Sequence, residues 1–466
     1  MQNPTFVSPY EPQLLLHMTK KILVIGAGRS TSALINYLLK ESEKNDWFVT
    51  VVDQDADLAH SKVKDHPRGT SGFLDINDAF TRINMIRDSD IVISMLPAHM
   101  HMEVARDCVE NRKHMVTASY ISDEMKALDE RAQEAGVILM NEIGVDPGID
   151  HLSAKKVLDE IQSKGGKMLI FESFTGGLVA PESDNNPWNY KFTWNPRNVV
   201  LAGSGGAVKF IQCGKYKYIP HHQLFRRTEV IDIEGWGRFE GYANRDSLRY
   251  RSIYGLDEIP TIYRGTLRRP GFCRAWDVFV KLGMTDDSYI LDDSENMTHR
   301  DLINTFLAYS PVDTVELKLM HYLNIPQDDP VMEKLQWLGI FDNEKLGLKK
   351  ATPAQALQHI LMKKWNLEPN DKDMVVMWHK FGFELNGEKR MIEASMVKIG
   401  NNARDTAMAQ TVGLPVGMAT KLILNGTIHT PGVHIPIQKE VYEPMLEELK
   451  SHGIVFSEVE VPYQGY

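Results

Sequence analysis

A short acidic segment holds the densest group of side chains in this chain that could carry out chemistry. Residues 141–151 read Asn-Glu-Ile-Gly-Val-Asp-Pro-Gly-Ile-Asp-His and directly follow an apolar run at residues 137–140. Carboxylates and imidazoles are the side chains that most often transfer protons in enzymes. The glycines and the proline end the preceding strand and hold these side chains on a tight turn. Whether the turn is a reaction site or a helix cap depends on where it lies in the fold.

The bulk composition excludes several classes of protein. A chain of 466 residues is too long for one hydrophobic core and implies about two or three domains. The net charge of −10 argues against nucleic-acid binding, which usually needs a basic face. The 3 cysteines cannot build a disulfide framework, which fits a reducing, cytoplasmic compartment. We also expect no membrane partner, because the apolar runs are far shorter than the roughly 18 residues of a span, and no metal, because the histidines lack ligand spacing.

A glycine turn between a strand and a helix predicts a dinucleotide site. The turn follows the buried-strand run at 21–25 and consists of Gly26, Ala27, Gly28, Arg29 and Ser30. Gly26 permits the tight turn, and Gly28 lets a pyrophosphate approach the backbone at the helix N-terminus. The third position of the motif is Thr31 instead of Gly or Ala, so the fingerprint is imperfect.

The second strand, at residues 48–52, ends in Asp53. A carboxylate at this point accepts hydrogen bonds from the adenosine ribose hydroxyls and repels a 2′-phosphate. We therefore expect NAD as the cofactor, with NADP less favoured. The alternative is a solvated aspartate in a turn.

Further strand–helix units follow this pair. Strands are expected up to residues 74–75 and at 90–97, 114–120 and 137–140, with helices at 101–110 and 122–135. Such alternation predicts an α/β fold with a doubly wound parallel sheet. Ligands bind such sheets outside the carboxyl ends of the strands. The acidic segment leaves the sheet at that edge, beside the loops at 95–97 and 119–120.

The rest of the chain predicts a second and a third structural unit. Mixed aromatic and polar residues after residue 151 suit a mainly antiparallel sheet, and residues from about 273 to 370 show helical periodicity. Five segments are expected: an N-terminal extension at 1–20, a Rossmann domain at 21–150, an α+β mixed-sheet domain for substrate binding and dimerisation at 151–272 and 373–440, an all-α insert at 273–372, and a C-terminal segment at 441–466 that could return to the Rossmann domain.

The chain resembles the glutamate-forming saccharopine dehydrogenases, also called saccharopine reductases, from residue 21 onward. Several separate motifs in the right order carry the likeness. They are residues 141–151, Gly176-Gly177-Leu178-Val179-Ala180-Pro181-Glu182, Tyr190-Lys191-Phe192-Thr193-Trp194, Asn244-Arg245-Asp246-Ser247, Arg264-Gly265-Thr266-Leu267-Arg268 and Thr411-Val412-Gly413-Leu414-Pro415.

The resemblance implies an enzyme that oxidises saccharopine with a nicotinamide cofactor and water to glutamate and 2-aminoadipate 6-semialdehyde, or runs in reverse, as a homodimer. By resemblance, the cofactor would contact Ala27, Gly28, Arg29, Ser30, Leu74, Asp75, Leu96, Ala118, Ser119, Val145, Asp146 and Pro147. Saccharopine would contact Ser119, Tyr120, Asp146, Arg245, Gly265, Thr266 and Leu267.

Fungal members of the family place a Cys-Arg pair after the second strand and use NADP. Asp53 and Gln54 stand there in this chain, which agrees with the charge argument for NAD and favours the lysine-degrading direction. Thr175 replaces a cysteine that fungal enzymes carry before Gly176, so no thiol can be essential at that point.

The chemistry requires removal of a proton from the secondary amine before hydride leaves. Asp146 and Tyr120 are the catalytic candidates, followed by His151, for which a structural role is favoured. The alternative for Asp146 is a carboxylate that forms the turn or caps a helix. Two other functions remain open: a carboxyspermidine or carboxynorspermidine dehydrogenase, and a non-catalytic dinucleotide-binding relative.

Overall fold

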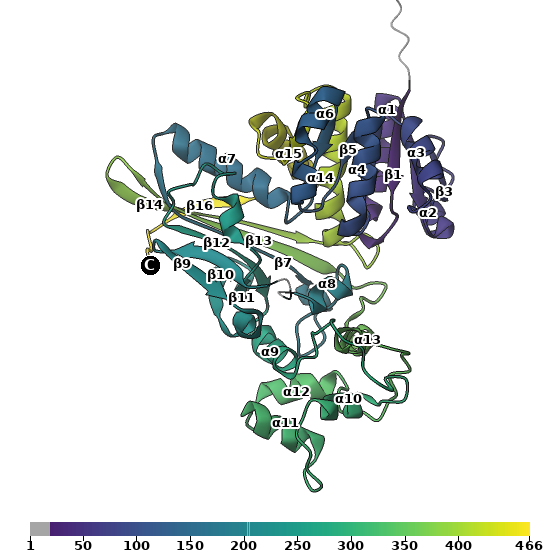
Figure 1. Ribbon diagram of the computed structural model, residues 1–466. Coiled ribbons are helices and arrows are strands. Elements are labelled where there is room, and N and C mark those ends of the chain that lie inside the picture. The colour runs from purple at the N-terminus through teal and green to yellow at the C-terminus, as the bar shows by residue number, and fades with distance from the viewer. Residues whose placement is uncertain (1–18, 203, 205) are drawn as a thin grey trace, which may run out of the picture.

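The computed structural model describes residues 19–202, 204 and 206–466. A parallel sheet with its helices, a larger mixed sheet and a group of helices make up this part of the chain (Figure 1). The N-terminal extension expected at residues 1–20 falls mainly on residues 1–18, which lie outside the described residues.

The first sheet has seven strands, and every pair in it is parallel. In spatial order its strands are β15 (Gly432–His434), β6 (Ile138–Met140), β5 (His114–Val116), β4 (Ile91–Ser94), β1 (Lys20–Ile25), β2 (Trp47–Asp53) and β3 (Gly69–Phe73). The central strands are almost uniformly apolar because helices cover both faces, so both sets of side chains are buried. The predicted doubly wound parallel sheet is confirmed.

Helices flank this sheet on both sides (Figure 1). They are α1 (Ser32–Asn45), α2 (Ala56–Val63), α3 (Ala79–Arg87), α4 (His101–Glu110), α5 (Asp123–Lys126), α6 (Asp129–Ala135) and α14 (Ala407–Leu424). Side-chain caps set several helix starts: Asp55 accepts from the Leu58 amide, Asp78 from the Thr81 amide and Ser122 from the Met125 amide.

The second sheet has nine strands and is mixed. Its strands are β7 (Lys167–Val179), β8 (Val208–Gln212), β9 (Lys215–Ile219), β10 (Thr228–Ile233), β11 (Gly237–Ala243), β12 (Thr261–Arg268), β13 (Asp373–Leu385), β14 (Glu388–Ile399) and β16 (Ser457–Val461). Strand β12 pairs with β7 in parallel, whereas β13 lies antiparallel to β7. Helix α7 (Ile149–Ser163), which begins inside the acidic segment, packs on one face through Val157 and Leu158.

The helical group completes the fold below this sheet (Figure 1). It contains α9 (Phe272–Leu282), α10 (His299–Thr305), α11 (Val315–Leu323), α12 (Pro330–Trp337) and α13 (Pro353–Trp365). Three buried tryptophans, Trp188, Trp276 and Trp365, pack together where these helices meet the second sheet. The helices therefore share one hydrophobic core with the sheet.

The last fifth of the chain, residues 373–466, is distributed differently from the expected segments. Strands β13 and β14 join the second sheet, but α14 packs on α1, where a Cβ on Gly413 would lie 2.7 Å from the Leu34 nitrogen. Helix α14 is long and apolar enough to cross a membrane, yet 83% of that stretch is buried inside the fold. An apolar helix needs cover on all sides, and the Rossmann helices and the second sheet provide it.

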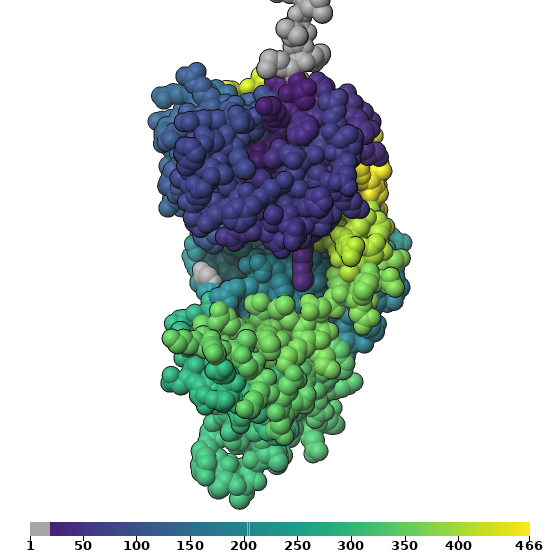
Figure 2. Space-filling view, turned by 90° about the vertical axis from the view of Figure 1, so that its right-hand side faces the viewer, coloured from purple at the N-terminus to yellow at the C-terminus, as the bar shows by residue number. Residues whose placement is uncertain are grey.

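One further C-terminal element also lies in a different domain from the expected one. Strand β15 extends the parallel sheet next to β6, although residues 373–440 were assigned to the second domain. Helix α15 (Lys439–Ser451) contacts α7 and α14, and its Glu448 accepts from the Tyr37 hydroxyl of α1 at 2.7 Å, so residues 441–466 return in part to the Rossmann domain, whereas β16 pairs with β14 in the second sheet. Figure 2 shows the hollow between the Rossmann part at the top and the helical group below it.

Candidate active site

The glycine turn after β1 has the shape that a pyrophosphate requires. Gly26 has a φ of +106°, and a Cβ there would lie 2.8 Å from the Met95 carbonyl oxygen, so the turn packs tightly against the loop after β4. Gly28 is exposed, and a Cβ there would meet no atom within 4 Å. Arg29 and Ser30 then begin the 3₁₀ turn η1 (Arg29–Thr31), which leads into α1. This open approach to a helix start fits a dinucleotide phosphate.

Asp53 is bonded to the backbone of the same turn. Its Oδ2 accepts from the Ala27 amide at 2.6 Å, and its Oδ1 accepts from the Asp55 amide at 2.9 Å. The carboxylate therefore organises the glycine turn and the start of α2. At the end of the next strand Leu74 is buried, and Asp75 accepts from the Asn77 amide at 3.0 Å.

The loops after β5 and β6 touch at the carboxyl edge of the sheet. The Glu142 amide donates to the Ser119 carbonyl at 3.1 Å, and a Cβ on Gly144 would lie 3.0 Å from the Ala118 Cβ. Leu96, in the loop after β4, is half-buried. The structure thus brings the acidic segment, Ser119 and Tyr120 together at one edge.

The acidic segment makes a turn that only glycine permits. Gly148 has a φ of +147°, and a Cβ there would lie 2.0 Å from the Gly144 carbonyl oxygen. Asp150 Oδ1 accepts from the Gly148 amide at 2.6 Å, just where α7 begins. The carboxylate that supports the turn backbone is therefore Asp150. Among the described residues, the hydrogen bonds of Asp146 go to two side chains.

Those two side chains are Tyr120 and Arg264. The Tyr120 hydroxyl donates to Asp146 Oδ1 at 3.1 Å, and Arg264 Nη2 donates to the same oxygen at 2.7 Å. Asp146 Oδ2 is left without a bond to the described residues and is not sealed from the cleft, since the side chain is 13% exposed. Burial raises the pKa of Asp146 and Asp150 adds to this rise, although Arg264 opposes it. Burial and the carboxylate of Asp146 raise the pKa of Tyr120 well above its usual value, so Tyr120 is a neutral donor.

Arg264 joins this acid to a second, deeper one. Its Nη2 also lies 2.5 Å from Asp150 Oδ2, and the guanidinium stacks 4.3 Å above the Tyr250 ring. Burial acts to raise the pKa of Asp150, but His151 and Arg264 outweigh it and hold that pKa below its usual range. Two carboxylates share one arginine here, and the one facing the cleft has the higher pKa.

His151 lies beneath the site. It is completely buried, with Nε2 2.8 Å from Glu142 Oε2 and Nδ1 2.5 Å from the Tyr254 hydroxyl. Glu142 also accepts from the Ile121 amide at 3.0 Å and from the Tyr250 hydroxyl at 3.2 Å. These contacts hold the base of the turn, so His151 supports the site without reaching the cleft.

Residues 265–267, which were expected to hold substrate, lie on strand β12. Successive side chains of a strand point to opposite faces of the sheet. A Cβ on Gly265 would lie 2.1 Å from the Phe174 ring, and Leu267 is 0% exposed in the core. Only half-buried Thr266 shares the face of Arg264 and Arg268. The side chain of Leu267 therefore cannot contact a substrate. Because alternate residues of a strand share a face, the motif itself could have indicated that Arg268 lies on the same face as Arg264 and Thr266.

The site residues expected from the sequence included neither Arg264 nor Arg268, although both stand in the motif at residues 264–268. Arg268 is 4% exposed, and its guanidinium lies 5.1 Å from the Tyr190 ring and 5.7 Å from the Tyr242 ring. Its Nη1 donates to the Leu267 carbonyl at 2.9 Å, and Glu240 lies opposite it on β11, but it forms no direct ion pair with the described residues. Three buried polar atoms in this region have no hydrogen-bond partner among the described residues: Arg268 Nε, Thr175 Oγ1 and Thr193 Oγ1. Such atoms are rare in native proteins, so this region has unused capacity to bind a polar ligand. Arg245 lies at the rim, exposed, 4.8 Å above the Tyr120 ring.

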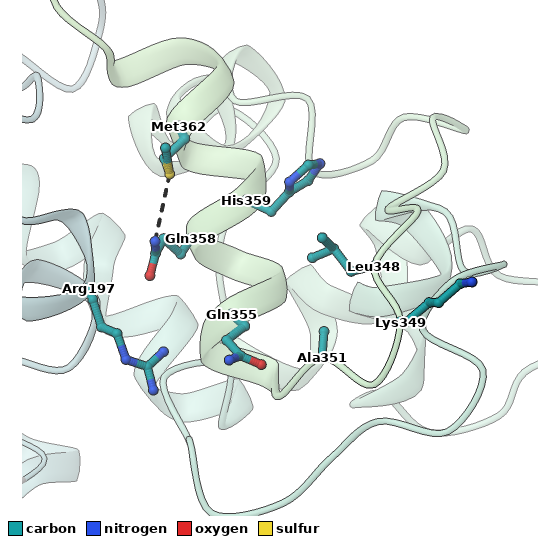
Figure 3. A pocket seen from close by; sticks show the side chains of 8 residues that line it. All are labelled: Arg197, Leu348, Lys349, Ala351, Gln355, Gln358, His359 and Met362. Atoms are coloured by element: carbon teal, nitrogen blue, oxygen red, sulfur yellow. Dashed lines mark hydrogen bonds between the residues drawn. The ribbon is translucent and has the colours of Figure 1, made fainter. Parts of the chain in front are cut away.

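A separate open pocket of about 580 Å³ lies beside α13, and Figure 3 shows the side chains around it. None of the expected site residues lines it. Its Arg197 is paired with Asp287, so it lacks the buried, unpaired groups of the Arg268 region. In the described ranges no group of His, Cys, Asp or Glu side chains is arranged to hold a metal ion.

A glycine turn at a helix start, with a buried acid–tyrosine–arginine group at the same sheet edge, defines a dinucleotide-dependent oxidoreductase. Family comparison specifies the class. The model of the saccharopine dehydrogenase NADP binding domain matches residues 22–140, and that of the saccharopine dehydrogenase C-terminal domain matches residues 144–454. The chain belongs to the saccharopine dehydrogenase family, whose members are oxidoreductases acting on a CH–NH bond.

Individual relatives agree with this placement. Saccharopine dehydrogenase [NADP(+), L-glutamate-forming] of Saccharomyces cerevisiae is 33% identical over 95% of this chain and 99% of its own length. Mitochondrial alpha-aminoadipic semialdehyde synthase of Rattus norvegicus is 32% identical over 95% of this chain, which spans 48% of that protein. The apo structure of the yeast enzyme superimposes with a TM-score of 0.85 at 32% identity, covering 95% of this chain and 100% of that one. Homospermidine synthase of Legionella pneumophila, at 10% identity and a TM-score of 0.53, shares the fold alone.

The expected preference for NAD is wrong by these comparisons. The matching family model is that of an NADP binding domain, and the yeast relatives carry NADP(+) in their names. The argument for NAD treated the Asp53 carboxylate as free for the ribose. In the structure both of its oxygens bond backbone amides, those of Ala27 and Asp55. Two amide donors stabilise the negative charge of the Asp53 carboxylate, so this carboxylate repels the 2′-phosphate of NADP less strongly than a carboxylate without such donors would.

Proposed function

We propose that this chain is an L-glutamate-forming saccharopine dehydrogenase of lysine metabolism. It would oxidise saccharopine with NADP(+) and water to glutamate and 2-aminoadipate 6-semialdehyde, or run the reverse reaction. The observation that carries the proposal is Asp146, which is buried between Tyr120 and Arg264 at the carboxyl edge of the dinucleotide-binding sheet. The relatives of similar length that act on saccharopine support it.

The cleft offers cations suited to a substrate with several carboxylates. Arg268 is buried opposite Glu240 of β11 but forms no direct ion pair among the described residues, and Arg245 is exposed at the rim beside Tyr120. Arginine binds carboxylates through two parallel hydrogen bonds, so each is a candidate for one carboxylate of saccharopine. Thr266 would contact the chain between them. A polyamine would instead need acidic contacts along its length.

The residues of the site suit removal of a proton from a secondary amine. The turn at Gly26, Ala27, Gly28, Arg29 and Ser30 would hold NADP(+), which would supply a hydride acceptor for the carbon next to that amine. Asp146 would take the amine proton through Oδ2, since its Oδ1 already accepts from Tyr120 and Arg264. Its raised pKa brings its basicity closer to that of the substrate amine, which favours proton transfer. Tyr120 would hold the carboxylate in place and then orient the water that attacks the resulting imine.

Two expectations about the whole protein stay proposals. We infer a homodimer from the family resemblance, and a cytoplasmic location from the small number of cysteines, 3 in the chain.

A direct assay tests the proposed function. The purified protein is incubated with saccharopine and NADP(+), with NAD(+) for comparison, and reduced cofactor is followed by absorbance. We expect saccharopine-dependent reduction that the Asp146→Asn variant loses. A polyamine imine with NADPH serves as the alternative substrate. Absence of any signal with saccharopine, or a signal with the polyamine imine only, would overturn the proposal.

A further inference from the structure

A buried histidine joins two serines at the carboxyl edge of the parallel sheet. His101, the first residue of α4, is 4% exposed. Its Nδ1 lies 2.8 Å from Ser94 Oγ, and its Nε2 lies 2.7 Å from Ser119 Oγ. Ser94 ends β4 and Ser119 follows the neighbouring β5, so the ring bridges two strand ends beside the cleft. The mechanism above uses neither His101 nor Ser94.

The neutral imidazole ring of His101 can donate a hydrogen bond to only one of the two serines. Burial lowers the pKa of His101 to about 4, so the imidazole is neutral near neutral pH. A neutral imidazole carries one N–H donor and one bare nitrogen that accepts. One serine must therefore donate to the ring while the other accepts from it.

The burial of Ser94 decides between the two arrangements. Ser94 is 0% exposed, and within the described residues its hydroxyl bonds only to His101. If Nδ1 carried the proton, the hydroxyl hydrogen of Ser94 would be buried with no acceptor, which is costly. If Nδ1 is bare, Ser94 donates to it, so the buried Ser94 hydrogen has an acceptor. The proton then lies on Nε2, which donates to Ser119 Oγ.

Ser119 is half-buried at the meeting point of the three loops. Because its oxygen accepts from His101, its own hydrogen points away from the ring. We propose that His101 is a positioning residue that holds the Ser119 hydroxyl as a donor toward an acceptor oxygen bound in the cleft. That oxygen belongs either to a substrate carboxylate or to the carboxamide of the nicotinamide. Only the identity of this acceptor oxygen rests on the proposed function.

Nuclear magnetic resonance tests the tautomer without any turnover. The full chain is labelled with ¹⁵N-histidine, and long-range ¹H–¹⁵N correlations show which ring nitrogen of His101 carries hydrogen. The His101→Gln variant assigns the signal. We expect the Nε2–H form in the native protein and a change of that signal in Ser94→Ala, which removes the donor to Nδ1. An Nδ1–H form in the native protein would overturn the proposal, whatever the substrate proves to be.

Kinetics and binding then identify the acceptor oxygen. Ser119→Ala should raise either KM for saccharopine or Kd for NADPH by roughly tenfold, the usual effect of losing a hydrogen bond to a charged or strongly polar oxygen. Ser94→Ala should raise the same constant by a smaller factor, and the double variant should equal Ser119→Ala, because both act through one hydroxyl. Additive effects, or no effect of Ser94→Ala, would contradict the proposal.

A matched control separates positioning from general destabilisation. Ser89 is also buried near β4 but at its other end, where its hydroxyl donates to the Ile86 carbonyl at 2.8 Å. Ser89→Ala should leave KM, Kd and the His101 signal unchanged, even if it lowers the melting temperature. NADPH binding is measured by fluorescence and does not require saccharopine to be the substrate. The role proposed for His101 can therefore be tested even if the proposed function fails.

Discussion

Arg264 Nη2 lies 2.7 Å from Asp146 Oδ1 and thereby links the second sheet to the edge of the parallel sheet. Arg264 belongs to β12, and Asp146 to the turn after β6, so 118 positions of sequence separate them. The same guanidinium also pairs with Asp150 at the start of α7. This contact fixes Asp146 between two domains. Several measurable consequences arise from it and from the neighbouring residues.

Asp146→Asn should lower turnover by roughly a hundredfold or more, because an amide cannot take the amine proton. The native enzyme should lose kcat/KM as pH falls through the pKa of Asp146, since only the ionised carboxylate is a base. That pKa is raised by burial, so the loss begins at a higher pH than for an ordinary aspartate. The variant should lack this acidic limb. A pH profile of kcat/KM measures both effects, and near-normal turnover of the variant would remove Asp146 from the mechanism.

Arg264→Leu should destabilise the protein by about 3–5 kcal/mol, because it leaves two buried carboxylates without their shared cation. The measurement is the free energy of unfolding from denaturant titration near neutral pH. Arg238→Leu is the control, since the ion pair of Arg238 with Asp232 is exposed to solvent. Equal stability of the two variants would show that the Arg264 cluster contributes no special stability.

Arg268→Met should affect binding and stability in opposite directions. The arginine is buried without an ion-pair partner among the described residues, so replacing it with an apolar side chain of similar length should leave the unfolding free energy unchanged or raise it. KM for saccharopine should rise by at least about tenfold if Arg268 binds a carboxylate. Steady-state kinetics and thermal denaturation measure the two effects. A normal KM would exclude Arg268 from substrate binding.

Glu172→Gln should change how stability depends on pH. Glu172 is buried on the second sheet with Lys380 3.8 Å away, and burial raises its pKa from 4.5 to about 7. The folded protein therefore binds this proton more tightly than the unfolded chain does. The stability that this gives is full below pH 4.5 and is lost as pH rises through about 7.

Glutamine does not titrate, so the variant should lose less stability than the native protein between about pH 5 and about pH 8. Melting temperatures at both values test this, with Glu388→Gln on exposed Glu388 as the control. An identical pH dependence in native protein and Glu172→Gln would contradict the assignment.

Local sequence patterns were enough for the parallel sheet and for its ligand-binding edge. Apolar runs such as residues 21–25 and 137–140 have no polar alternation, which is typical of strands covered on both faces. The glycines and the proline that end such runs indicate where loops leave the sheet. This order placed the acidic segment and the loop of Tyr120 at the same edge. The family resemblance then assigned Asp146 to the nicotinamide and the substrate, and Tyr120 to the substrate. The structure puts the two side chains in contact.

The failures have a common physical cause, which is that they depend on neighbours distant in sequence. The two hydrogen bonds of Asp53 come from the folded turn, so its identity alone did not predict the cofactor. Helix α14 lies far along the chain from α1, and its place was decided by which apolar faces remained uncovered. Arg264 and Arg268 are identical in type and four positions apart on one strand. Only Arg264 forms ion pairs with carboxylates among the described residues, and the sequence could not distinguish the two arginines.

The sequence by itself determined the fold class and the edge of the sheet at which the acidic turn lies, because apolar periodicity and glycine turns act over a few neighbouring residues. Tertiary structure alone decided which charged side chains pair and how their pKa values shift. It paired Arg264 with Asp146 and Asp150, left Arg268 without a direct ion pair among the described residues, and gave Asp146 the higher pKa of the two acids. Burial and charge pairing depend on packing between segments far apart in the chain, and no local pattern encodes that packing.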